Sequence, residues 1–154
     1  MAQNFIVSRS REIAAAPETV FPYLDDLHRW QLWSPWEGLD ADLHRTYSEP
    51  ANGVGARYAW EGNRKAGKGR LEITHAEPSR VALDLHFEKP FRADSQVAFT
   101  LEPTALGTLV TWAMSGRKNL MMRALSPVVN MDKMLGQDVE KGLAQLQVAV
   151  ERGA

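Results

Sequence analysis

The last quarter of the chain, residues 127–152, limits the possible folds more than any other stretch. Apolar residues recur there at steps of three or four, which places them on one face of a single long helix. They are Val128, Met131, Leu135, Val139, Leu143, Leu146 and Val150. Charged and amide side chains such as Asp132, Lys133, Gln137 and Glu140 lie off this stripe. The helix must therefore lie on an apolar surface and is not a membrane span. Ser126 and Pro127 suit the cap and the first position of this helix.

Most of the chain before this helix alternates between apolar and polar residues, as strands with one buried face do. Residues 80–88 show it most clearly, because Val81, Leu83, Leu85 and Phe87 alternate with polar or small residues. Short turns containing Gly, Pro or Asn separate the segments and indicate an antiparallel meander. The other predicted strands are residues 5–13, 41–49, 56–62, 68–76, 93–103 and 108–117.

Two short helices are predicted between the first and second strands. Pro17 suits the first position of a helix that follows Ala16, and Pro22 should keep this helix short or bent. Residues 28–33 form the second helix, and residues 119–125 form a brief amphipathic segment before the final helix. The sequence thus predicts an α+β fold, in which a curved antiparallel sheet of about seven strands wraps around the C-terminal helix. We expect one domain over residues 1–154.

The composition argues against several classes of function. The 18 basic and 19 acidic residues give a net charge of −1, which provides no field to attract nucleic acid. The absence of cysteine excludes disulfides, thiolate metal sites and a cysteine nucleophile. The four histidines show no metal-binding spacing, so we expect neither a metal nor another cofactor. No apolar run or signal-peptide pattern suggests stable membrane insertion, and we expect a cytoplasmic protein.

Several short motifs, in their order and spacing, resemble the START-like helix-grip superfamily, also called SRPBCC. They are AAPETVF at 15–21, LDD at 24–26, Trp30, WSPW at 33–36, GVGARY at 53–58, WEGN at 60–63, GKGRLE at 67–72 and GQDVEKGL at 136–143. The polyketide cyclase/dehydrase type is the most similar, and the resemblance covers nearly the whole chain. It implies a mostly apolar cavity between the sheet and the closing helix that takes a hydrophobic small molecule.

The inward positions of the strands and the first turns of the final helix are the expected lining of this cavity. The predicted ligand-binding residues are Tyr58, Trp60, Leu71, Ile73, Leu83, Leu85, Phe87, Val97, Phe99, Trp112, Met114, Met131 and Leu135. Trp30, Trp33 and Trp36 are expected to pack the short helices against the sheet edge or the cavity mouth.

Three functions follow from these residues and the resemblance. The first is a carrier or sensor that binds a hydrophobic small molecule as a monomer or homodimer. The second is a cyclase or dehydratase that uses general acid–base catalysis, which needs an ionisable group in the cavity. His75 is the histidine that could face inward beside Ile73, although no catalytic residue is assigned. The third is an interaction module of the Hsp90-activator type, which needs an exposed apolar patch; the polar Asp84 and His86 argue against one on their strand.

Overall fold

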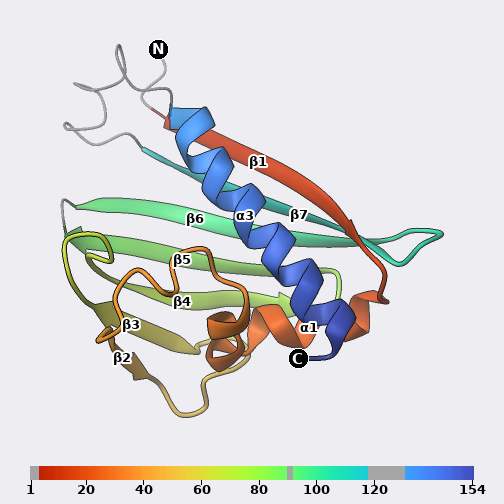
Figure 1. Cartoon of the computed structure of the whole chain (residues 1–154), viewed down its shortest axis with the longest axis horizontal. Helices are drawn as coiled ribbons and strands as arrows, with labels where there is room; N and C mark the ends of the chain where they lie inside the picture. Colours follow the sequence, from red (N-terminus) through yellow and green to blue (C-terminus); the bar gives the residue numbers. More distant parts are fainter. Residues whose placement is uncertain (1–3, 90–91, 118–130) are drawn as a thin grey trace.

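The computed structural model describes residues 4–89, 92–117 and 131–154. It has a seven-stranded antiparallel sheet, two short helices between the first two strands, and a long C-terminal helix across one face of the sheet (Figure 1). The predicted α+β helix-grip architecture is therefore confirmed.

The sheet has the order β1-β7-β6-β5-β4-β3-β2. The last six strands form a meander, and β1 joins the far edge by pairing with β7. This topology follows from the sequence because the short helices separate β1 from β2 while only turns separate the later strands. The strands are β1 (Asn4–Ile13), β2 (His44–Tyr47), β3 (Arg57–Glu61), β4 (Lys68–Glu77), β5 (Arg80–Lys89), β6 (Ala93–Pro103) and β7 (Thr108–Arg117).

The short helices are α1 (Pro17–Asp25) and the 3-10 helix η1 (Leu27–Leu32). Pro17 stands in the first turn of α1, where its missing N–H removes no helical hydrogen bond. The helix ends three residues after Pro22, in agreement with the expectation that this proline keeps it short. Asp26 then caps η1, because its carboxylate accepts a 3.1 Å hydrogen bond from the backbone N–H of His28.

The long helix α3 (Met131–Arg152) crosses the inner face of the sheet diagonally, from β1 toward α1 (Figure 1). Val139, Leu143, Leu146 and Val150 are buried, which confirms this part of the predicted apolar stripe. The predicted helix start at Ser126 and Pro127, the residue Val128 and the segment 119–125 lie outside the described residues. None of the helices in the described ranges is long and apolar enough to cross a bilayer.

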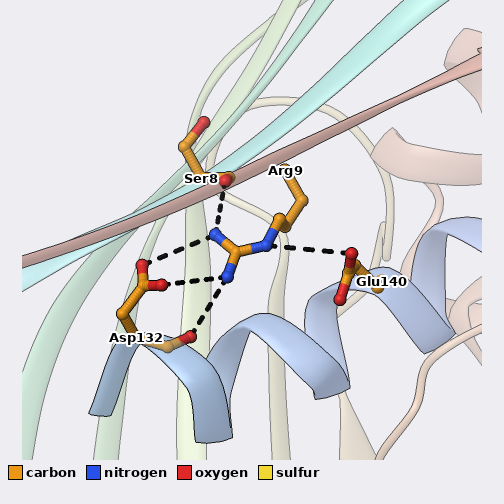
Figure 2. A network of polar contacts seen from close by, with 4 residues as sticks. All are labelled: Ser8, Arg9, Asp132 and Glu140. Carbon is orange, nitrogen blue, oxygen red and sulfur yellow. Dashed lines mark hydrogen bonds and ion pairs between the residues drawn. The ribbon is translucent and has the colours of Figure 1, made fainter. Parts of the chain in front are cut away.

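Two glycines let α3 lie close to the sheet. A Cβ atom built on Gly142 would lie 2.6 Å from Trp112 Cζ3 and 2.9 Å from Pro35 Cδ, so only glycine fits this contact. Gly136 leaves room for the guanidinium of Arg9 from β1. Figure 2 shows this guanidinium bound to α3, with Arg9 Nη2 3.0 Å from Asp132 Oδ2 and Nε 3.9 Å from Glu140 Oε1. These contacts hold the N-terminal half of α3 over β1.

Candidate functional site

An apolar pocket lies between the inner face of the sheet and residues 33–43, which follow η1 and which we call the covering segment. In Figure 1 this segment runs in front of β3 to β5, beside α3. The sheet contributes mainly large apolar side chains, and η1 and the covering segment contribute the rest. The described lining residues are Trp30, Ser34, Trp36, Glu37, Leu43, Tyr58, Trp60, Leu71, Leu83, Leu85, Phe87, Val97 and Trp112.

The open space in this pocket is small. A water-sized molecule can place its centre within a volume of about 40 Å³, whereas one water needs about 10–15 Å³ of such space and a cavity that accepts benzene has about 150 Å³. Aromatic rings occupy most of the rest, with Tyr58 stacked on Trp60 at 5.8 Å and Phe87 against Trp60 at 5.7 Å between ring centroids. A ligand larger than a few waters therefore requires these side chains or the covering segment to move.

Eight of the thirteen predicted ligand-binding residues line the pocket, namely Tyr58, Trp60, Leu71, Leu83, Leu85, Phe87, Val97 and Trp112. Ile73, Phe99 and Met114 are buried in the adjoining core and do not line it. Leu135 is half-buried on α3, and the side chain of Met131 lies outside the description.

The described lining of this pocket also differs from the expected one. Among the described residues no side chain of α3 lines the pocket, and the covering segment closes it instead. The reason is that Gly142 and the Arg9 ion pairs hold α3 against β1, β7 and the covering segment, while the open space lies beneath the other half of the sheet.

The prediction missed five lining residues, and all of them come from η1 and the covering segment. Trp30 and Trp36 were expected at the sheet edge or the cavity mouth, and both line the pocket. Trp33 belongs to the core, where its ring meets Phe99 and Trp112 edge-on. Ser34, Glu37 and Leu43 carried no signal, because a segment without helical or strand periodicity does not reveal which side chains face inward.

A partly buried ion pair links the covering segment to β2. Arg45 Nη2 lies 2.5 Å from Glu37 Oε1, and the two side chains are 27% and 15% exposed. Glu37 lines the pocket, whereas Arg45 occupies the inner face of β2 beside Tyr47 and Tyr58. Arg45 Nε is buried and has no hydrogen-bond partner among the described residues. The pocket thus has one carboxylate among its described lining residues, neutralised from the edge of the sheet.

Two tyrosines adjoin this ion pair. The rings of Tyr47 and Tyr58 stack at 4.9 Å, and Gln31 Nε2 donates a 2.8 Å hydrogen bond to the Tyr47 hydroxyl. Burial raises the pKa of Tyr58 far above its ordinary value, and the negative charge of Glu37 raises it further. Tyr58 therefore keeps its proton at neutral pH.

Trp112 lines the pocket with a hydrogen-bond donor that has no acceptor among the described residues. The residue is 1% exposed, and its indole Nε1 is buried without a partner in this part of the chain. Trp33 and Trp36 meet its ring edge-on at 5.6 and 5.7 Å, which fixes the orientation of the indole.

His75 does not line the pocket. The pairing of β4 with β5 shifts register between Ile73 and His75, so the strict alternation of faces breaks at Thr74. His75 consequently pairs opposite Ala82, is 42% exposed, and places Nε2 3.1 Å from Glu77 Oε1. His86 lies on the outer face as expected and contacts Asp94 at 2.7 Å. The described part of the chain contains no cluster of three or more His, Cys, Asp or Glu side chains suited to a metal ion.

The chain matches one protein-family model over nearly its whole length. The family model for polyketide cyclase/dehydrase and lipid transport proteins matches residues 4–151. A search of curated proteins gave no significant match.

Solved structures show the same fold. Protein MLL2253 from Mesorhizobium loti has a TM-score of 0.70 at 21% identity, over 97% of this chain and 99% of that one. The Aha1 dimer from Colwellia psychrerythraea has a TM-score of 0.68 at 18% identity, over 96% of both chains. CalU16 from Micromonospora echinospora has a TM-score of 0.60 at 18% identity, over 96% of this chain and 73% of that one.

Proposed function

Because this chain belongs to the polyketide cyclase/dehydrase and lipid transport family, we propose that it is a carrier or sensor that binds a hydrophobic small molecule in the pocket under the covering segment. The observation that carries the proposal is the lining, since eleven of the thirteen described lining side chains are apolar or aromatic. Burial of apolar ligand surface in such a pocket supplies about 25 cal/mol per Å², less the cost of association. The proposed ligand-binding residues are the ones that line this pocket.

In this proposal the ligand reaches the pocket by displacement of the covering segment. Three polar contacts among the described residues join that segment to β2 and to the turn between β3 and β4. The first is the ion pair of Glu37 with Arg45 on β2. The other two come from Asn63 in the turn, whose backbone N–H donates to Asp40 Oδ2 at 2.8 Å and whose Nδ2 donates to the carbonyl of Leu39 at 3.2 Å. The edge strand β2 has fewer neighbours than the central strands. Such segments belong to the parts of a protein that open at the lowest free energy.

Native mass spectrometry of freshly purified protein, combined with organic extraction, tests this function. We expect a co-purified apolar molecule or stoichiometric uptake of an added one. A protein that carries nothing and takes up none of a panel of apolar compounds would contradict the proposal. We further propose that the protein works in the cytoplasm as a monomer or a homodimer. Light scattering after size-exclusion chromatography distinguishes the monomer from the homodimer.

One observation favours an enzyme as the second candidate. Glu37 places a carboxylate in the apolar lining, and Tyr58 lines the same pocket. A carboxylate in such a site can act as a general acid or base in a cyclisation or dehydration. If Glu37 has this role, Glu37→Gln abolishes turnover of a substrate and leaves its binding within a few-fold of the wild-type value. Equal turnover by the two proteins would exclude Glu37 as that group.

A further inference from the structure

The indole N–H groups of four tryptophans differ in whether they have a hydrogen-bond acceptor. Trp30 donates to the carbonyl of Leu24 at 2.9 Å, Trp33 to that of Tyr23 at 2.8 Å, and Trp60 to that of Ala66 at 2.9 Å. Trp112 is as deeply buried as Trp33, yet its Nε1 has no acceptor within residues 4–89, 92–117 and 131–154. A buried donor without a partner lowers the stability of the folded protein, so native structures rarely keep one unless a ligand or water completes it.

The missing acceptor can be placed in the pocket, because Trp112 is one of its lining residues and the open space exceeds the volume of one water. The other polar side chains of the described lining are Ser34 and Glu37. Ser34 Oγ already accepts a 3.3 Å hydrogen bond from the backbone N–H of Trp36. Glu37 contributes a carboxylate, whose charge Arg45 balances from β2.

The polar groups of the pocket determine which polar group a bound ligand can carry. An oxygen acceptor satisfies Trp112 Nε1, whereas a pure hydrocarbon leaves it unpaired. A ligand carboxylate would bring an uncompensated negative charge into a poorly hydrated pocket, because Arg45 is already paired with Glu37, and this disfavours the anion. The oxygen is therefore uncharged.

We infer that the ligand carries a neutral carbonyl group on its apolar skeleton and that this oxygen accepts a hydrogen bond from Trp112 Nε1. The inference rests on the proposed function, including the displacement of the covering segment. It adds that Trp112 is the specificity-determining residue and that uncharged carbonyl compounds are the class of ligand.

The test uses three single-ring probes and ¹⁵N-labelled protein. Acetophenone carries the carbonyl, α-methylstyrene replaces the carbonyl oxygen by a CH₂ group of similar shape, and benzoate carries a carboxylate. We expect acetophenone, and not α-methylstyrene, to move the Trp112 indole resonance downfield, and benzoate to bind at least about tenfold more weakly than acetophenone.

The variant Trp112→Phe keeps an aromatic ring and removes the N–H. In this variant we expect the ratio of the two dissociation constants, α-methylstyrene over acetophenone, to fall about tenfold from its wild-type value. An unchanged ratio, or equal indole shifts with both probes in the wild-type protein, would overturn the inference and indicate that water alone pairs with this N–H. If the variant does not fold, the wild-type indole shift decides.

The outcomes separate this inference from the proposed function. If both neutral probes bind equally well, the pocket takes apolar ligands, and only the inferred hydrogen bond between Trp112 and a ligand carbonyl fails. If neither probe binds, the proposed function itself fails.

Discussion

Arg45 Nη2 and Glu37 Oε1 lie 2.5 Å apart, and their ion pair joins the edge strand β2 to the segment that covers the apolar pocket. The pair is mostly shielded from solvent, so it is screened less by salt than a surface pair. This ion pair stabilises the closed pocket. In the proposed function, a ligand must break the same ion pair to enter.

Replacement of Arg45 by methionine should therefore make the pocket easier to open. Loss of a partly buried ion pair of this kind weakens the closed state by about 1 kcal/mol, which raises the population of open molecules about fivefold. We expect N-phenyl-1-naphthylamine, a neutral fluorescent probe, to associate faster by a similar factor in stopped-flow measurements.

Arg9→Met is the matched control for this experiment. Arg9 and Arg45 have the same 27% side-chain exposure and both pair with carboxylates, but Arg9 binds α3 and does not adjoin the pocket. The control should lose a similar amount of stability in urea unfolding and keep the wild-type association rate. Equal acceleration in both variants would show that general loosening, and not the covering segment, controls access.

The tyrosines provide a prediction about pH. Burial raises the pKa values of Tyr47 and Tyr58 in the folded protein, while unfolded tyrosines titrate near pH 10. As the pH rises past about 10, the unfolded state loses protons first, so the stability contributed by these neutral phenols declines from there toward the folded pKa.

Tyrosinate absorbance at pH 10.5 measures this effect. We expect the folded protein to show less ionised tyrosine than the protein in urea at the same pH. Tyr58→Phe should lower the absorbance of the urea sample by about one tyrosine in three and leave that of the folded sample nearly unchanged. A drop of equal size in the folded sample would place the Tyr58 hydroxyl in water.

The helix α3 offers a prediction about packing. Gly142→Ala improves helix propensity by about 1 kcal/mol, but the new methyl group would lie 2.6 Å from the ring of Trp112 and 2.9 Å from Pro35. Overpacking of this kind costs about 1–3 kcal/mol, so the variant should be destabilised by up to about 2 kcal/mol in chemical unfolding.

Gly136→Ala controls for the propensity gain. Its new methyl group would meet only the end of the Arg9 side chain, which can move away. The gain from helix propensity and the loss of a surface ion pair then nearly cancel. We expect the free energy of unfolding to change by less than about 1 kcal/mol. A Gly142→Ala protein as stable as Gly136→Ala would mean that α3 does not lie as close to Trp112 as described.

The sequence predicted the sheet well because most of its strands alternate between apolar and polar residues and the turns between the later strands are short. The register shift at Thr74 could not be foreseen, since one extra residue reverses the faces of a strand without changing its composition. For this reason Ile73 faces the core as predicted while His75 does not face the pocket.

The pocket itself was only half predictable. Residues on the regular strands, such as Leu71 and Leu85, follow from period two, but Glu37 and Leu43 depend on how an irregular segment folds back over the sheet. The position of α3 likewise depends on contacts between distant parts of the chain, including Gly142 with Trp112 and Arg9 with Asp132. No local pattern of residues encodes those contacts.

Fluorescence titration with N-phenyl-1-naphthylamine tests the central claim, which is that the pocket under the covering segment binds an apolar small molecule. Leu43 and Leu39 are both half-buried in that segment, and only Leu43 lines the pocket. We predict saturable one-to-one binding by the wild-type protein and by Leu39→Trp, and at least about tenfold weaker binding by Leu43→Trp, whose larger ring takes up the remaining space. Absence of saturable binding in the wild type, or equal binding by the two tryptophan variants, would contradict the claim.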